Sequence, residues 1–416
     1  VVAPTRLASG LAGRVEPAAS EYADRLAAIE QDYWNVVADQ DRFSIGPAQR
    51  EAFSGVEDHA VTTNTGERWR RLRRALHPAF TRERIRTYAE TMGETAGGVV
   101  DVWDHGAELD LRRAMRLLSV NVLGDALLGV DLRGNEAIVM DAADALLARA
   151  NFRRPGQLLP DWVPTPTDRR FERAVRALDE FVDGILAERQ QSATGPSSEP
   201  GADEPTDVCA DLLAAYERGE LSMPEVRHNL VALLLAGHDS PATALTSALY
   251  LLGDHPEHRQ AVAAEYDEVV GEGPPRAADV ENLALTRRVV SEALRLYPPT
   301  TGVNRQAVEP VTLGGYDFEP GDQFLLPQWV VHRDGRYWDD PERFDPSRWG
   351  GERDRPEYAY FPFSGGPRAC VGSDFARQEL VVALSTILGR VDLDVATRGR
   401  LSFEPSIQLR PTAPIE

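Results

Sequence analysis

Apolar residues recur at three- and four-residue intervals along most of the chain, the spacing that puts them on one face of an α-helix. This pattern covers 17–40, 67–80, 84–104, 111–127, 136–151, 167–190, 207–218, 223–252, 256–270, 286–296 and 371–389. Short strand-like segments follow late in the chain, at Val311–Leu313, Gln323–Leu326 and Leu401–Leu409. The pattern predicts a mainly α fold with a minor β portion.

One predicted helix differs from the rest because residues 229–246 are apolar on nearly every side, which is typical of a buried central helix. Pro241 has no N–H for the carbonyl of Gly237, and its ring crowds that carbonyl. We therefore expect the helix to open or kink at Gly237. With Asp239 and Ser240 in the same turn, the opening could hold a small ligand and relay protons. A proline kink with locally satisfied polar groups is an equal alternative.

The 416 residues show no internal repeat, and we expect one domain over 1–416 with a flexible acidic loop at 191–206. The longest apolar run is about nine residues, whereas a membrane span needs about twenty. The first six residues show no basic-then-apolar leader, so we expect no signal peptide or membrane anchor. Two cysteines, Cys209 and Cys370, suit a reducing compartment and predict a cytoplasmic protein.

The charge balance is strongly acidic: 66 Asp and Glu against 45 basic residues give a net charge of −21, and the basic residues are all arginine. The absence of lysine excludes Schiff-base and P-loop chemistry. The negative field argues against nucleic acid as a partner. Such an acidic excess favours solubility in high salt and predicts a halophilic host, with GC-biased codon usage as the alternative explanation for the missing lysines.

Cys370 lies in a loop rich in glycine, Phe363-Ser-Gly-Gly-Pro-Arg-Ala-Cys-Val-Gly372, just before a predicted helix. Arg368, backbone N–H groups and the helix N-terminus could each stabilise a thiolate there. Such a thiolate is a nucleophile or a metal ligand, whereas an isolated cysteine is by default a buried structural residue. Cys209 stands among acidic residues that raise a thiol pKa, and we expect it to be inert.

Two charged motifs complete the candidate chemistry. Glu292 and Arg295 are three residues apart among apolar neighbours, which predicts a buried ion pair in need of a third partner, and Arg343 is the candidate. Trp69 and Arg73 are one helical turn apart in a basic block at 68–86, where they could hold a carboxylate together.

The cysteine loop matches the pattern F-x-x-G-x-R-x-C-x-G, the haem-ligand signature of the cytochromes P450, at each fixed position. The Trp69-x-x-x-Arg73 pair, Glu292-x-x-Arg295 and the segment Trp338–Trp349 precede it in the family's order. Over nearly its whole length the chain therefore resembles the cytochrome P450 family, of the soluble prokaryotic type, with a halophilic archaeon as the suggested source. The resemblance implies the P450 fold, a single large domain with a long central helix over the haem.

The resemblance also implies the cofactor, haem b (iron protoporphyrin IX), with the Cys370 thiolate as axial iron ligand. Phe363 and Gly372 belong to the same cofactor loop. The resemblance places a set of basic and aromatic side chains at the haem propionates: Trp69, Arg73, Arg305, His332 and Arg368. It makes Glu292, Arg295 and Arg343 a structural triad behind the cysteine loop.

Residues 236–241 resemble the family's oxygen-activation motif A-G-x-[DE]-T-T, which gives Gly237, Asp239 and Ser240 catalytic roles with O2 as co-substrate. Ser240 stands in place of the usual threonine, and Pro241 follows it. Serine lacks the methyl group that restricts χ1, so we expect a less well positioned hydroxyl. The resemblance gives this substrate pocket: Leu233, Ala236, Thr300, Thr301, Val303 and Ile407.

The activity implied is a monooxygenase that inserts one oxygen atom from O2 into an apolar fatty acid, terpenoid, carotenoid or sterol-like compound. No flavin or nicotinamide fingerprint is present, so electrons are expected from a ferredoxin and an NAD(P)H-dependent ferredoxin reductase. We expect docking at Arg70, Arg71 and Arg74, and a monomeric protein. The alternatives are a peroxide-driven peroxygenase, a non-catalytic haem sensor or electron-transfer module, and a haem-free helical interaction protein.

Overall fold

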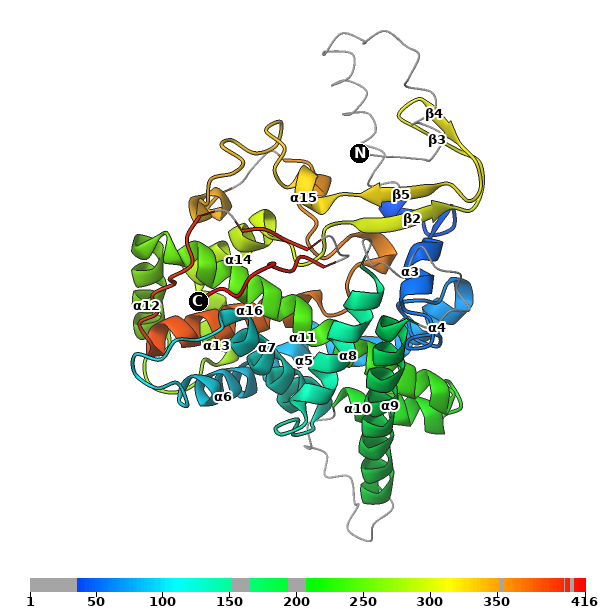
Figure 1. Ribbon diagram of the computed structural model, residues 1–416, viewed down its shortest axis with the longest axis horizontal. Helices are drawn as coiled ribbons and strands as arrows, with labels where there is room; N and C mark the ends of the chain where they lie inside the picture. The colour runs from blue at the N-terminus through cyan, green and yellow to red at the C-terminus, as the bar shows by residue number, and fades with distance from the viewer. Residues whose placement is uncertain (1–35, 152–164, 194–206, 352–354, 400, 405–407) are drawn as a thin grey trace.

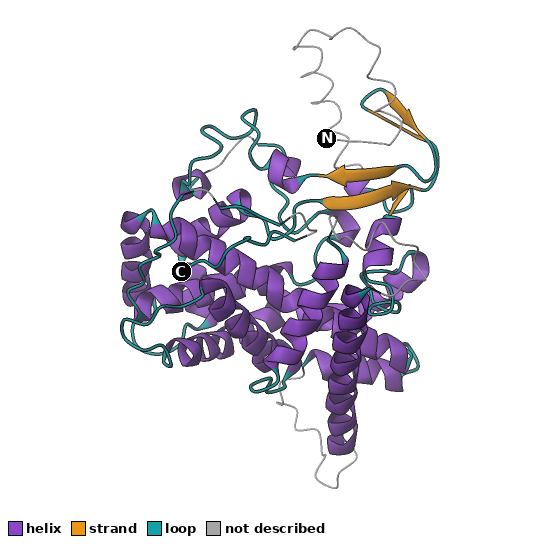
Figure 2. Ribbon diagram, in the orientation of Figure 1, coloured by secondary structure: helices purple, strands orange, loops and turns teal. Residues whose placement is uncertain are grey.

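The structure is a computed structural model that describes residues 36–151, 165–193, 207–351, 355–399, 401–404 and 408–416. Helices form the body of the molecule and the strands gather at one end (Figure 1, Figure 2). The longer helices are α4 (Gly66–Leu76), α6 (Ala89–Val100), α7 (Leu111–Val122), α8 (Glu136–Arg149), α9 (Pro166–Ala193), α10 (Val208–Glu217), α11 (Met223–Gly253), α12 (Pro256–Val269), α14 (Ala284–Leu296) and α16 (Ser373–Arg390). The shorter ones are α3 (Pro47–Ala52), α5 (Arg82–Thr87), α13 (Ala277–Asn282) and α15 (Gln328–Val331). This confirms the predicted mainly α fold class.

The strands are few and short. β1 (Phe43–Ser44), β2 (Val303–Ala307) and β5 (Gln323–Leu326) form an antiparallel sheet in that order, and β3 (Val311–Leu313) pairs with β4 (Tyr316–Phe318). Two predicted strands are thus confirmed. Of the predicted strand at 401–409, residues 405–407 lie outside the described residues, and the remainder makes only the isolated bridges Thr300↔Gln408 and Phe403↔Pro411.

Helix α11 is the central element, as its apolar sequence predicts. It begins with a capping box between Ser222 and Glu225 and contacts α7, α14 and α16. The helix runs through Pro241 without a break, so the predicted interruption is not seen. Gly237 has another role in packing, because a Cβ there would lie 2.9 Å from Leu123 Cδ1.

Several helix boundaries differ from prediction for local reasons. Segment 67–80 ends as a 3-10 turn at His77–Phe80, where Pro78 cannot donate an N–H. Segment 84–104 divides into α5 and α6. Segment 111–127 ends in a π-turn at Leu123–Leu128, which Gly129 closes with φ +61°. Most of the predicted helix 17–40 and acidic loop 191–206 lies outside the described residues, although 191–193 belong to α9.

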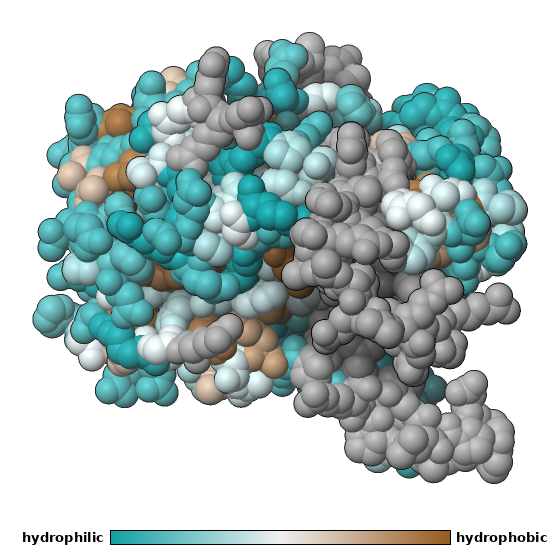
Figure 3. All heavy atoms as spheres, turned by 90° about the horizontal axis from the view of Figure 1, so that it is seen from above, coloured by the Kyte–Doolittle hydropathy of each residue, from teal (hydrophilic) through white to brown (hydrophobic). Residues whose placement is uncertain are grey.

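The main hydrophobic core joins helices from α4 to α16, and a second, smaller core lies around Phe43, Phe318 and Phe324 at the sheet. From above, the visible described surface is mostly hydrophilic, with small hydrophobic patches (Figure 3). In the described part of the chain, no helix combines the length and apolar character that a bilayer crossing requires.

Candidate active site

After its first two turns, helix α11 is buried except along one face. Between Asn229 and Leu252, all residues are buried except Leu233, Ala236, Gly237 and Ser240. Their spacing of i, i+3, i+4 and i+7 makes one continuous stripe. A buried central helix with one accessible stripe presents that stripe to a ligand space. Two predicted pocket residues and two predicted catalytic residues form it.

The cysteine loop turns tightly before α16. Ser364 and Gly366 both have left-handed backbones, with φ of +61° and +63°. At Gly366 a Cβ would also overlap the Val37 carbonyl, so only glycine fits there. The Cys370 N–H donates to the Phe363 carbonyl at 2.9 Å. These constraints fix the backbone on both sides of the sulfur.

Two guanidinium groups act on the Cys370 sulfur, and neither is the predicted Arg368. The side chain is accessible, yet the surrounding protein is close enough that burial is the largest effect and raises the thiol pKa. A backbone hydrogen bond at Gly372 and the charges of Arg73 and Arg377 oppose that rise. Burial thus outweighs these groups, and a bound cation would favour the thiolate by placing a positive charge beside the sulfur.

Three predicted cofactor-binding arginines share one property: in the described residues, none of them is ion-paired with a carboxylate. Arg305 is buried, donates only to the Asn304 carbonyl, and has its pKa lowered by burial to about 10. Arg368 donates to the Asn64 carbonyl at 3.0 Å and stacks on the Trp69 ring at 4.7 Å. Burial, with Arg305 second, lowers its pKa to about 10.

Arg73 is half-buried, and no described hydrogen bond or ion pair engages its side chain; burial lowers its pKa and Cys370 opposes this. In a protein of net charge −21, desolvated arginines without acids fit an anionic ligand. Together with an accessible thiol nearby, this donor set fits a metal-bearing group with carboxylate substituents. The residues present therefore fit the predicted haem.

His332 does not share that property. It is fully buried, and its Nε2 accepts the Phe361 N–H at 2.9 Å. Its backbone carbonyl accepts from Arg295 Nη1 at 2.9 Å. Burial is the main cause that lowers its pKa to about 3, so the ring is neutral. This geometry supports a structural place beside Arg295 rather than the predicted contact with a propionate.

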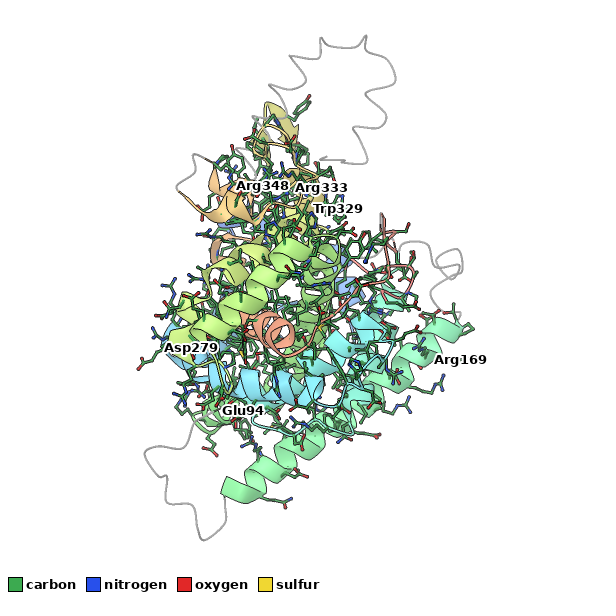
Figure 4. The ribbon with its side chains drawn as sticks, turned by 90° about the vertical axis from the view of Figure 1, so that its left-hand side faces the viewer. Glu94, Arg169, Asp279, Trp329, Arg333 and Arg348 are labelled. Atoms are coloured by element: carbon green, nitrogen blue, oxygen red, sulfur yellow. The ribbon has the colours of Figure 1, made fainter. Side chains whose placement is uncertain are left out.

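Glu292 and Arg295 form the predicted buried pair, with both side chains fully buried and bidentate contacts of 2.8 and 2.9 Å. The third partner is Arg348, whose Nε lies 3.3 Å from Glu292 Oε1. Arg343 is exposed and contributes only its carbonyl, which accepts from Arg295 at 3.0 Å. The predicted third partner was therefore wrong. Arg348 lies with Arg333 and Trp329 toward the strand end of the molecule (Figure 4).

The misplacement has a physical reason. Both arginines lie in the segment Trp338–Trp349, and spacing alone does not separate them. The chain after Asp345 enters a 3-10 turn, Pro346–Trp349, that buries Arg348. The same turn brings Trp349 Nε1 to Glu292 Oε2 at 3.0 Å, and Asp345 donates its N–H to Oε1 at 3.0 Å.

Asp239 belongs to a second buried cluster that the sequence reasoning missed. Arg116 Nε, Arg410 Nη2 and Arg112 Nη2 lie 3.0, 3.2 and 3.5 Å from its carboxylate. Asp144 also pairs with Arg116 and Arg410, at 3.1 and 2.8 Å. Burial alone would raise the pKa of Asp239, but Arg410 and the other nearby cations hold it below its ordinary value. Arg112 and Arg116, one turn apart on a predicted helix, were the available signal.

The remaining predicted pocket residues lie where the sheet meets the C-terminal segment. Thr300, Thr301 and Val303 are half-buried, and Thr300 Oγ1 donates to Gln328 Oε1 at 2.8 Å. Ile407 lies outside the described residues. Two surface cavities of about 690 and 750 Å³, lined in part by Trp103 and by Arg343, contain neither Cys370 nor the accessible stripe of α11.

The predicted docking arginines are all ion-paired. Arg70 pairs with Asp41 at 3.2 Å and Arg74 with Glu67 at 3.1 Å, both on the surface. Arg71 reaches the buried Glu225 at 2.6 Å. Arg74, with 73% of its side chain exposed, is the most available of the three.

Comparison with known proteins agrees with this geometry. The family model described as Cytochrome P450 matches residues 33–415. Cyclooctatin synthase of Streptomyces melanosporofaciens is 34% identical over 353 residues, covering 83% of this chain and 75% of the relative. Cyclooctat-9-en-7-ol 5-monooxygenase of the same organism is 31% identical over 341 residues, covering 80% and 72%. Pentalenene oxygenase of Streptomyces avermitilis is 28% identical over 351 residues, covering 83% and 74%. These Streptomyces relatives give no support to the predicted halophilic archaeal host.

Proposed function

The chain belongs to the cytochrome P450 family, whose members are haem-thiolate monooxygenases, and from this premise we propose that Cys370 is its iron ligand and that the stripe of α11 is the oxygen and substrate side. The observation that carries the proposal is the convergence of the accessible thiol with desolvated arginines that lack acidic partners. When bound, a haem with a thiolate ligand supplies activation of dioxygen for transfer of one oxygen atom.

The residues of this chain would hold the cofactor and position the charge and the proton donor on the oxygen side. Arg305, Arg368 and Arg73 would hold the two carboxylate substituents, and Trp69 would pack beside them under Arg368. Asp239 would stay ionised within its arginine cluster and hold a negative charge at a fixed place beside Ser240. The Ser240 hydroxyl would offer its proton to the oxygen side.

For the substrate we propose a cyclic terpenoid. The relatives named for cyclooctatin, cyclooctat-9-en-7-ol and pentalenene support this class. The accessible stripe supports an apolar ligand, because Leu233, Ala236 and Gly237 offer no polar side chain. The test is a spin-state titration of the haem-loaded protein with cyclic terpenes, linear fatty acids and sterols. We expect a cyclic terpene to give the lowest dissociation constant in this titration. A lower dissociation constant for fatty acids or sterols would overturn the proposal.

For the electron source we propose a ferredoxin that docks near Arg74. Converting Arg74 to glutamate leaves a carboxylate beside Glu67, so the rate of reduction by an acidic ferredoxin should fall several-fold at low salt. Arg169→Glu is the matched control, because it makes the same change of charge at an exposed arginine on another helix, α9 (Figure 4). Substrate affinity should not change in either variant. Equal reduction rates in R74E and R169E would contradict the docking site.

A further inference from the structure

The C-terminal segment reaches both members of the Asp239–Ser240 pair. Gln408 Nε2 lies 3.4 Å from Ser240 Oγ, and Arg410 Nη2 lies 3.2 Å from Asp239 Oδ2. Residues two apart in extended chain project to the same side. Two side chains from one segment therefore contact the adjacent acid and hydroxyl on α11.

Ser240 also differs from its hydroxyl neighbours on α11. Thr243 and Thr246 donate their O–H groups to carbonyls four residues back, at 2.8 and 2.7 Å. In the described residues Ser240 makes no such bond, and Gln408 is its hydrogen-bond partner. Because the amide N–H donates to Ser240 Oγ, the serine proton is not consumed by that bond. It remains available to an acceptor on the accessible stripe.

The backbone around Gln408 is itself held. Gln408 bridges Thr300, and the Leu409 N–H donates to the Pro299 carbonyl at 2.8 Å. Arg410 is buried between Asp239 and Asp144. The amide is therefore presented from backbone that is held at Gln408 itself and at the two residues after it, as a positioning residue requires.

We propose that Gln408 is a positioning residue that fixes the rotamer of Ser240 and directs its O–H toward the oxygen side of the site. This rests on the proposed function, and it supplies what the serine lacks. A threonine methyl would restrict χ1; here a hydrogen bond from outside the helix would do so instead.

The chemical consequence concerns the fate of oxygen. Dioxygen that receives two electrons from ferredoxin and two protons has two outcomes. One oxygen atom enters a substrate C–H bond and the other leaves as water, or both leave as hydrogen peroxide. A well-placed hydroxyl donor favours the first outcome because it delivers a proton at a defined position. Loss of that placement should raise the peroxide fraction without weakening substrate binding.

The test is a double-mutant cycle of Q408A and S240T in the haem-loaded protein with ferredoxin and reductase. We expect Q408A alone to raise peroxide released per NAD(P)H several-fold, with an unchanged substrate dissociation constant from the spin-state titration. In the S240T background, where the methyl restricts χ1, Q408A should change the peroxide fraction by less than about twofold. Equal effects of Q408A in both backgrounds would overturn the proposal.

Two further readouts separate positioning from a general structural effect. Q408E keeps the size but turns the donor into an acceptor, so it should take the serine proton and raise the peroxide fraction at least as much as Q408A. Crystal structures of the haem-loaded wild type and Q408A should show one Ser240 rotamer in the first and more than one in the second. If both structures show the same single Ser240 rotamer, the proposal is overturned, even if turnover cannot be measured. If the haem-loaded wild type lacks the Cys370 thiolate ligand, the proposed function fails, and that result is distinguishable from failure of the Gln408 proposal.

Discussion

Glu292 and Asp239 are both buried carboxylates surrounded by arginines, and their surroundings differ in completeness. Glu292 accepts from Arg295, the Trp349 ring and the Asp345 backbone and forms an ion pair with Arg348, while the remaining N–H groups of Arg295 donate to backbone carbonyls. Asp239 pairs with three guanidiniums, and it shares two of them, those of Arg116 and Arg410, with another carboxylate, Asp144.

The two clusters also differ in how many of their buried polar atoms are hydrogen-bonded. In the described residues, more buried atoms lack a hydrogen-bond partner around Asp239 than around Glu292: Arg112 Nε and Nη2, Arg116 Nε, Arg410 Nε and Asp144 Oδ1, against Arg348 Nε. A more completely satisfied network rigidifies a fold, whereas a less satisfied one controls charge without fixing each atom. We therefore infer that the Glu292 cluster supports the segment before the cysteine loop, and that the Asp239 cluster sets the electrostatics of the oxygen side.

The largest expected effect is a loss of stability in the Glu292 cluster. Arg348→Ala removes one buried partner of Glu292 and should lower the free energy of unfolding by about 4 kcal/mol. Arg343→Ala, the matched control, removes only an exposed side chain and should cost about 0.5 kcal/mol or less. Denaturant unfolding of both variants measures the difference. Similar losses would restore Arg343 to the triad.

A third buried carboxylate, Glu379 on α16, extends the comparison because no arginine accompanies it. It is fully buried, neither oxygen has a partner within hydrogen-bond geometry in the described residues, and burial raises its pKa to about 8. The unfolded chain releases this proton at a lower pH than the folded protein does. Stability should therefore fall as pH rises from about 4.5 to about 8, by roughly 4 kcal/mol from this group.

Glu379→Gln should remove that component of the pH dependence. Unfolding of the wild type and E379Q at pH 5 and pH 8 measures it, and the difference in stability between them should change by about 3 kcal/mol in favour of E379Q at the higher pH. Parallel pH profiles would show that Glu379 is not a raised-pKa group.

Substitutions in the Asp239 cluster should reduce turnover more than they reduce the free energy of unfolding. Asp239→Asn leaves Arg116 and Arg410 paired with Asp144 but removes the carboxylate that pairs with Arg112, and should cost about 2 kcal/mol of stability and about tenfold in turnover. Asp144→Asn is the control, because it removes the other carboxylate of the cluster and leaves Asp239 and Ser240 unchanged. Turnover losses of equal size in D239N and D144N would contradict a special role for Asp239.

The smallest effect concerns salt. Relief of repulsion among the excess acids should raise the free energy of unfolding by about 1 kcal/mol between about 0.1 and 2 M NaCl. The losses in R348A and D239N should be nearly independent of salt, because buried pairs are screened little. A melting series without stabilisation above about 1 M would contradict salt adaptation of this protein.

The sequence predicted the helical architecture and the cysteine loop because both depend on local signals, namely apolar periodicity and a dense motif. It failed where tertiary contacts decide. Arg348 and Arg343 are indistinguishable by spacing, and a 3-10 turn selects between them. His332 was predicted to contact a haem propionate, but its ring is buried and its Nε2 accepts the Phe361 N–H. The contacts of Arg410 and Gln408 with α11 span about 170 residues of sequence, as the separations of 171 and 168 show, and no local pattern encodes them.

The most direct test of the account is the absorption spectrum of the reduced, haem-loaded protein with carbon monoxide bound. The account predicts the red-shifted Soret band of a thiolate-ligated haem in the wild type and in Cys209→Ala, and its loss in Cys370→Ala. Cys209 is the matched control because it is buried on α10, with burial the main cause that raises its pKa to about 12. A Soret band at the position of imidazole-ligated haem in the intact wild type, or no haem uptake when haem is plentiful, would contradict the central claim.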